Sequence, residues 1–98
     1  PRLCRDRDLG TTGHGCTSRI GVKSTQNTVF ANGISVARHR DPARPHVIRV
    51  GKRCVGHRAR VNRASRSVFV SGIGVARIGD SYDRGRMIQG SNNVFAGG

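Results

Sequence analysis

Histidine and cysteine side chains gather in two stretches of the chain, at spacings suited to binding a metal. His14 lies two residues before Cys16, and Cys54 lies three residues before His57, with His46 upstream of that pair. Imidazole and thiolate are ligands typical of tetrahedral Zn²⁺, with Fe²⁺ as the alternative metal. Three histidines and one cysteine close a tetrahedron with no open position, which is typical of a structural metal. We therefore predict a metal site made by His14, His46, Cys54 and His57.

The remaining residues of these types have other expected roles. Cys16 is the alternative sulfur ligand if Cys54 is not bound. His39 stands where a sister repeat has Ile78, so we expect it at the surface or in packing. Cys4 matches an alanine in the same repeat and is expected in the core. Three cysteines cannot all pair, and no apolar signal-peptide core is present, so we expect free thiols in a chain made in the bacterial cytoplasm.

Acidic residues are too few, and too regularly placed, to favour catalysis. Only five are present, and Asp8, Asp41 and Asp80 each follow an arginine by three residues at the end of a repeat. A turn cap or ion pair at each repeat end is the expected role of these three. Asp6 and Asp83 belong to no catalytic motif, and the chain has neither a nucleophile elbow nor a phosphate-binding glycine loop. We expect a protein that is not an enzyme.

An internal repeat predicts how these residues are positioned. The frame V-F-x-x-G-I-x-V-A-R-x-x-D occurs at 29–41 and again at 68–80. A third copy opens at 94–98 as VFAGG, and its missing half, LCRDRD, stands at 3–8. Joining the two chain ends would close this third copy. The repeat therefore predicts one domain over 1–98, an all-β prism of three hairpins with pseudo-threefold symmetry and adjacent termini.

Each repeat alternates apolar with small or polar residues, as a half-buried strand does. Asn32-Gly33 and Ser71-Gly72 supply two-residue turns that favour positive φ. Each phenylalanine follows a valine in the repeat, so we expect the three phenylalanines in the core. The long loops between the hairpins, at 8–29, 41–68 and 80–94, need an anchor, and the predicted metal would supply it at the narrow end of a cone.

The formal net charge of +13 leaves one alternative open, a basic metal-stabilised module that binds nucleic acid. The basic residues are scattered from Arg2 to Arg86, however, and aromatic residues for base stacking are nearly absent. We therefore expect no nucleic-acid partner. No stretch approaches the about 20 apolar residues of a membrane helix.

With its three hairpins and histidine-bearing loops, the chain resembles the PAAR-repeat family over nearly its whole length. The proline-alanine-alanine-arginine motif is degenerate here, as SVAR at 35–38 and GVAR at 74–77. Further matches are VFANG, VFVSG, the ARIGD ending, GHGC at 13–16 and the closing QGSNNVFAGG. Many relatives carry Cys-Gly where this chain has Arg84-Gly85, so the sulfur ligand must come from elsewhere, with Cys54 as the candidate.

The resemblance implies a structural role at the tip of a contractile injection apparatus. Family members are small cones that cap the trimeric β-helical spike of a phage tail baseplate or a type VI secretion system. Their point is held by a metal, usually zinc, bound by three histidines and one cysteine, and the family histidines fall on His14, His46 and His57. The expected partners are thus a trimeric spike protein and the outer membrane of the target cell, which the tip helps to pierce.

Overall fold

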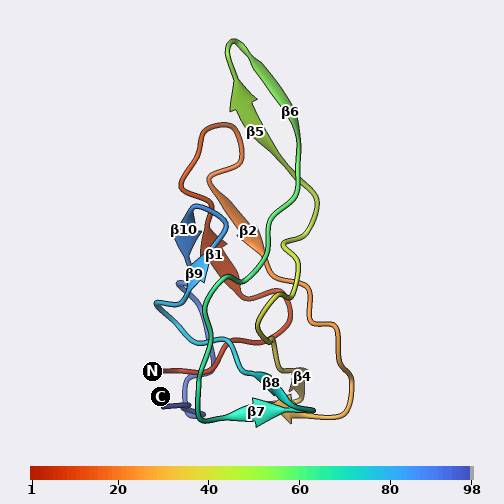
Figure 1. Ribbon diagram of the computed structural model, residues 1–98, viewed down its shortest axis with the longest axis vertical. Helices are drawn as coiled ribbons and strands as arrows, with labels where there is room; N and C mark the ends of the chain where they lie inside the picture. The colour runs from red at the N-terminus through yellow and green to blue at the C-terminus, as the bar shows by residue number, and fades with distance from the viewer. Residues whose placement is uncertain (98) are drawn as a thin grey trace.

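A computed structural model describes residues 1–97 of the chain (Figure 1). These residues form short β-strands joined by turns and contain no helix, which confirms the predicted all-β class. No helix of the described chain is therefore long and apolar enough to cross a bilayer. The strands form five two-stranded antiparallel hairpins. They are β1 (Leu9–Thr11), β2 (Arg19–Gly21), β3 (Phe30–Ala31), β4 (Ile34–Ser35), β5 (His46–Val50), β6 (Arg53–His57), β7 (Phe69–Val70), β8 (Ile73–Gly74), β9 (Ser81–Tyr82) and β10 (Gly85–Arg86).

The molecule is elongated and tapers toward one end. Its principal extents are 41 × 23 × 22 Å. Hairpins β3–β4 and β7–β8 lie at the broad end, and hairpin β5–β6 projects alone at the narrow end (Figure 1). Both ends of the described chain lie on the half of the molecule nearer the broad end. The long axis therefore separates the repeated hairpins from β5–β6.

The two intact repeats turn where the sequence predicts. Asn32 and Gly33 have φ of 56° and 76°, and Ser71 and Gly72 have φ of 52° and 78°. Two consecutive residues with positive φ form the tight turn whose twist matches a two-stranded hairpin. Asparagine and glycine tolerate this left-handed backbone better than most residues do.

The chain ends complete the third copy, as predicted. Leu3 N–H donates to the Val94 carbonyl at 2.9 Å, and Arg2 pairs with Phe95 in an antiparallel bridge. The intact hairpins make the corresponding hydrogen bonds, from Val36 to Val29 and from Val75 to Val68, both at 3.1 Å. The first and last residues of the described chain thus pair as the two strands of one hairpin do.

A closed ring of backbone hydrogen bonds joins the three copies. Cys4 N–H donates to Ala76 at 2.8 Å, Ala76 donates to Ala37 at 2.9 Å, and Ala37 donates back to Cys4 at 3.0 Å. All three side chains are fully buried, and their small size lets the three strands meet at this close distance. Cys4 is a core residue, as predicted.

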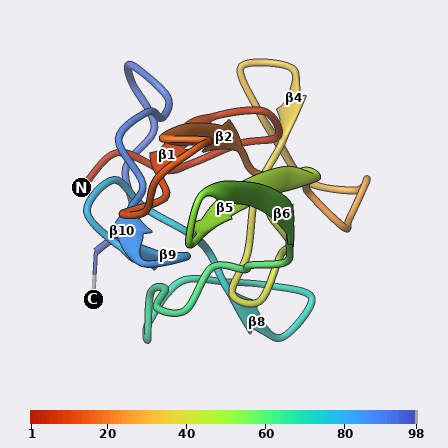
Figure 2. The ribbon, with the colours of Figure 1, turned by 90° about the horizontal axis from the view of Figure 1, so that it is seen from above.

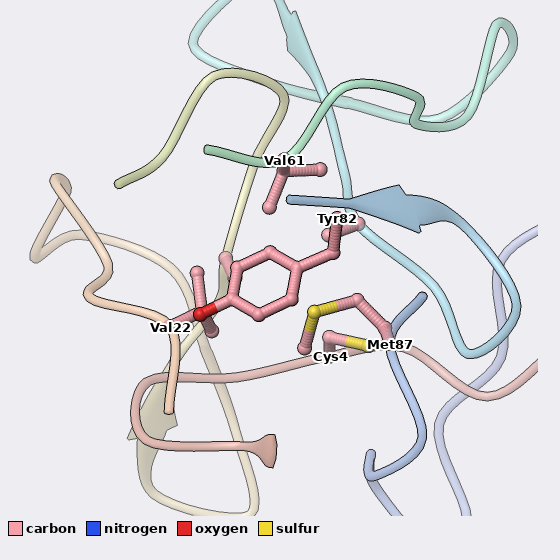
Figure 3. Packing of buried hydrophobic residues seen from close by; sticks show 7 residues of the cluster. Cys4, Val22, Val61, Tyr82 and Met87 are labelled. Carbon is pink, nitrogen blue, oxygen red and sulfur yellow. The ribbon is translucent and has the colours of Figure 1, made fainter. Parts of the chain in front are cut away.

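The main core packs directly on this ring (Figure 3). Its largest buried side chains are Tyr82 and Met87, and Val22 and Val61 complete it from the first two loops. Gly10 faces the Tyr82 ring so closely that a Cβ there would lie 2.1 Å from a ring carbon. The loops are therefore packed around one tyrosine and are not loosely attached.

The aspartates that end the repeats cap turns, as expected. Each accepts a hydrogen bond from the backbone N–H three residues earlier, at 2.7 to 2.8 Å. The pairs are Arg5 with Asp8, Arg38 with Asp41 and Arg77 with Asp80. In the first and last pairs the arginine side chain also forms an ion pair with the carboxylate.

The prediction that the phenylalanines lie in the core is wrong. Phe30, Phe69 and Phe95 are 54%, 55% and 64% exposed. Side chains alternate between the two faces of a strand, and in each copy the residue after the phenylalanine is the buried one. Those buried residues are Ala31, Val70 and Ala96. The repeat therefore presents its aromatic side chains outward.

The loops also contain more regular structure than the sequence suggested. Each of the three long loops forms a hairpin of its own, β1–β2 in the first, β5–β6 in the second and β9–β10 in the third. The strands of β5–β6 have five residues each, against two for each strand of the repeats. The longest regular hairpin thus lies outside the repeat.

Candidate metal centre

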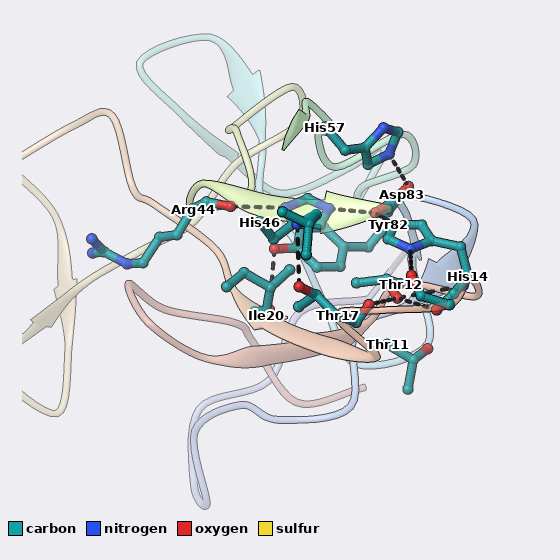
Figure 4. Close-up of polar contacts among 12 residues, drawn as sticks. Thr11, Thr12, His14, Thr17, Ile20, Arg44, His46, His57, Tyr82 and Asp83 are labelled. Atoms are coloured by element: carbon teal, nitrogen blue, oxygen red, sulfur yellow. Dashed lines mark hydrogen bonds and ion pairs between the residues drawn. The ribbon is translucent and has the colours of Figure 1, made fainter. Parts of the chain in front are cut away.

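Three histidines from two of the loops meet near the narrow end (Figure 4). His46 and His57 are directly opposite partners in the β5–β6 register, so both side chains lie on one face of that hairpin. His14 comes from the connection between β1 and β2. The centroids of the three rings are 4.8 to 5.4 Å apart. The predicted convergence of these histidines is confirmed.

The fourth member of the cluster is Asp83, from the turn of hairpin β9–β10. Its Oδ2 lies 2.8 Å from Nε2 of His14 and 2.9 Å from Nε2 of His46. Its Oδ1 lies 3.0 Å from Nε2 of His57. The four candidate ligand atoms all lie within 4.8 Å of one another, and the group could hold a metal ion. The Asp83 side chain is only 2% exposed.

Cys54, the predicted sulfur ligand, lies outside this cluster. It is three residues from His57 on the same strand, and an odd separation places two side chains on opposite faces of a strand. Cys54 instead forms a disulfide with Cys16, across a sequence separation of 38 residues. A cysteine in a disulfide has no thiolate to offer a metal, so Asp83 stands where the sequence analysis placed Cys54 or Cys16.

The expectation of free thiols is wrong for the same pair. Cys16 and Cys54 have Cα atoms 6.0 Å apart, in the ordinary range for a disulfide. An odd number of cysteines excludes only a complete pairing, and the unpaired residue is Cys4. Burial raises the pKa of the Cys4 thiol well above its usual range, with a smaller contribution from the nearby Asp8 and Asp80 carboxylates.

Hydrogen bonds on the outer side of two rings fix which nitrogen faces the centre. His14 Nδ1 lies 3.0 Å from the Gly15 carbonyl, and His46 Nδ1 lies 2.9 Å from the Arg44 carbonyl. A carbonyl oxygen only accepts, so each Nδ1 carries the hydrogen. In a neutral imidazole, Nε2 then has only a lone pair, and both lone pairs point at the Asp83 carboxylate.

That arrangement could hold a cation at its centre. A lone pair and a carboxylate oxygen 2.8 to 2.9 Å apart repel each other unless a proton or a metal ion lies between them. A single divalent ion bound by three Nε2 atoms and Asp83 satisfies every group, and the outer hydrogen bonds orient the rings as they commonly do in metal sites.

The charge state of Asp83 also favours a metal site. Burial by itself raises the pKa of this carboxyl, but its contacts with His57, His46 and His14 outweigh burial and hold its pKa below the ordinary value. The carboxylate is therefore ionised at neutral pH, as a ligand must be.

Local backbone geometry brings the first and third loops together at the centre. Gly13 has φ of 71°, and a Cβ there would lie 2.3 Å from the Arg84 carbonyl oxygen. The hydroxyl of the fully buried Thr12 donates a hydrogen bond to the Thr17 carbonyl at 2.6 Å. This bond joins the two sides of the connection that carries His14. Asp83 has φ of 54° in its two-residue turn. Glycine before His14 is thus needed for the contact between the loops.

Other histidine and acidic residues lie outside the cluster. His39 Nε2 lies 3.2 Å from the Asn62 carbonyl at the surface, in agreement with its predicted role. Asp83 was missed because it belongs to no motif. The loop order could have identified it: the third loop had no predicted ligand, and Asp83 is the one acidic residue of that loop after the repeat-end Asp80.

Comparison with known proteins adds no identification. No model of a protein family matches the sequence, and no curated protein matches it either. The residues and their geometry are therefore the basis for assigning a role.

Proposed function

We propose that this chain is a structural tip of the PAAR type, which caps the trimeric β-helical spike of a contractile injection system. The observation that carries the proposal is the set of exposed phenylalanines Phe30, Phe69 and Phe95, one from each copy of the repeat. Neighbouring aliphatic residues of the repeated hairpins are also exposed, between 37% and 42%; they are Val29, Ile34, Val68 and Ile73. Exposed large apolar side chains gathered on the repeated hairpins of a small protein favour an interaction site.

The arrangement of this surface suits a threefold partner. Viewed along the long axis, hairpins β3–β4 and β7–β8 and the segment before the C-terminus lie toward three corners (Figure 2). One chain with three similar hairpins can present similar contacts to the three subunits of a trimer. The capped spike end would in turn have its exposed strand ends and apolar side chains covered. Aromatic anchors are enriched among the residues that dominate such interfaces.

The metal of the proposed tip is Zn²⁺, with Fe²⁺ as the alternative. Three imidazoles and a carboxylate fill the four positions of a tetrahedral site, so we assign the metal a structural and not a catalytic role. A carboxylate in place of a thiolate is a harder ligand and makes Fe²⁺ more competitive than it would be at a cysteine-containing site.

The mechanism assigns one task to each end of the molecule. The broad end would seat on the spike, at the tail baseplate of a phage or the point of a secretion apparatus. The Cys16–Cys54 disulfide cross-links the first loop to hairpin β5–β6, and a metal bound by His14, His46 and His57 would do the same. These links would keep the narrow end folded while it is pushed through the outer membrane of a target cell.

Binding to a trimeric β-helical spike tests the proposal. The wild-type chain should bind with a stoichiometry of one chain per trimer, measured by native mass spectrometry. The variant F30S/F69S/F95S should lose binding, because truncating a hot-spot residue costs about 2 kcal/mol or more. It should keep its thermal stability, because all three side chains are more than half exposed.

The matched control is V50S/V55S, which removes exposed apolar side chains from the opposite end. Equal loss of binding in both variants would contradict the proposed seat. The net charge of +13 supports one other function, binding of nucleic acid. Tight, strongly salt-dependent binding to DNA by a chain that ignores the spike would favour that function instead.

A further inference from the structure

Hairpin β5–β6 continues beyond the metal centre and forms the narrow end of the molecule (Figure 1). The ligands His46 and His57 are the pair at its root, and three further pairs separate them from Val50 and Arg53 at its apex. Gly51, with φ of 61°, makes the turn. Any object that the narrow end meets therefore contacts this apex before it contacts the metal site.

Aliphatic side chains stand exposed at this apex. Val50 is 58% exposed and Val55 is 38% exposed, whereas Ile48, the cross-strand partner of Val55, is buried. Val50 is more exposed than any other valine of the described chain. Since exposing an aliphatic side chain to water is unfavourable, the apex is suited to a partner that provides an apolar environment.

Unpaired positive charge surrounds the two valines. Arg49, Lys52 and Arg53 are all exposed, and within residues 1–97 none of them takes part in an ion pair. The sequence has no acidic residue between Asp41 and Asp80. The apex thus combines a local charge of +3 with exposed aliphatic groups.

We infer that the apex of β5–β6 binds the surface of an anionic lipid bilayer and inserts Val50 and Val55 below the headgroups. Cations at the headgroup level and aliphatic groups beneath it are the combination by which interfacial segments bind anionic membranes. A nucleic acid would use the cations but gains little from the valines, and the hairpin has no Phe, Tyr or Trp for base stacking. The inference rests on the proposed function, in which this end meets the target membrane.

The hairpin is held in shape before it meets a membrane. The disulfide from Cys54 to Cys16 and the bridge between Cys16 and Ile48 attach the first loop along its middle. Arg49 N–H also donates to the Gly15 carbonyl at 3.2 Å. A preorganised binding element loses little conformational entropy on binding, which favours a short apex over a flexible segment.

Vesicle flotation with the full chain tests the inference. The wild-type chain should bind vesicles of phosphatidylglycerol and phosphatidylcholine and should not bind vesicles of phosphatidylcholine alone. The variant R49Q/R53Q should bind the anionic vesicles about thirtyfold more weakly. The variant V50T/V55T, which keeps β-branched side chains in the strands, should bind about fivefold more weakly at unchanged charge.

The matched control is R63Q/R66Q, which removes the same charge from exposed residues outside the hairpin. It should bind as the wild-type chain does, and retained metal content in every variant should show that the fold is intact. Equal loss in R49Q/R53Q and R63Q/R66Q, or unchanged binding of V50T/V55T, would overturn the inference in favour of diffuse electrostatic attraction. Absence of vesicle binding, or a preference for DNA that V50T/V55T leaves unchanged, would also overturn it. The hairpin variants leave the phenylalanine residues unchanged, so spike capture by these variants reports separately on the proposed function.

Discussion

Replacement of Asp83 by asparagine tests the metal centre most directly. The substitution keeps the size of the side chain and removes the charge that faces all three Nε2 atoms at 2.8, 2.9 and 3.0 Å. Loss of a residue that only orients a metal ligand already weakens metal binding 10- to 100-fold. Because Asp83 is itself a ligand in the proposed site, we expect D83N to bind metal at least about a hundredfold more weakly.

The same substitution should lower thermal stability in a metal-dependent way. A hundredfold loss of affinity corresponds to about 2.7 kcal/mol of stabilisation when free metal is in excess. For a chain of this size, 1 kcal/mol shifts Tm by about 4 to 8 °C, so the melting temperature of the metal-loaded chain should fall by about 11 to 22 °C. Scans with and without a chelator separate this effect from any change in the metal-free protein.

Two controls make the result decisive. D6N removes an equivalent charge from a carboxylate that pairs with Arg44 away from the centre, and it should keep full metal content by elemental analysis. C54S removes the sulfur and should also keep the metal. The assignment of the ligands is refuted if D83N keeps a full equivalent of metal while C54S loses it.

Four further predictions concern the cross-links and the core. The Cys16–Cys54 disulfide closes a loop of 38 residues and contributes at most about 4 kcal/mol to stability. Reduction and chelation both break the attachment of the first loop to hairpin β5–β6. Together they should therefore lower Tm by less than the sum of their separate effects. The folded chain should not react with iodoacetamide, because its one free thiol, that of Cys4, is buried. Mass spectrometry should detect one modified cysteine after unfolding without a reductant, and three after unfolding with a reductant. Burial raises the pKa of both Cys4 and Tyr82, so each contributes stability that is present below its unfolded pKa and lost above it. For Cys4, the free energy of unfolding should fall by about 1.4 kcal/mol per pH unit above about pH 8.5, as measured by denaturant titration. A free energy of unfolding that stays constant up to pH 10 would contradict this prediction. Gly10→Ala should destabilise by about 1 to 3 kcal/mol or more in the same assay, because the new Cβ collides with the Tyr82 ring.

The repeat made the hairpins predictable, because it fixed their turns and the pairing of the chain ends. Asn32-Gly33 specifies positive φ through local chemistry, and the split copy could be matched residue by residue. Phe30 and its two counterparts were wrongly predicted in the core. A hydrophobic residue that recurs in a repeat indicates that its copies share one environment, but it does not indicate whether that environment is the core or the surface. In a chain that exposes one face of each hairpin, the shared environment is the surface.

The three histidines were found by residue type, whereas the fourth ligand depended on strand geometry. Cys54-x-x-His57 would supply two ligands from a turn or a helix, but in the extended strand β6 the two side chains point to opposite faces. The sequence does not show that this stretch is a strand, since the repeat contains no equivalent hairpin. Asp83 could be found only after the third loop was placed beside the first.

The ring formed by Cys4, Ala37 and Ala76 also determines the order in which the fold can be completed. Two of its three hydrogen bonds involve Cys4, and the neighbouring Leu3 must find Val94, 91 residues away along the chain. Closing such a long loop precedes any stabilisation from the contact, and folds dominated by distant pairings form slowly. During synthesis Leu3 therefore has no Val94 to donate to until residue 94 has been made, although Cys4 already has Ala37 as a partner. Closure of the third copy would then be a late event in folding.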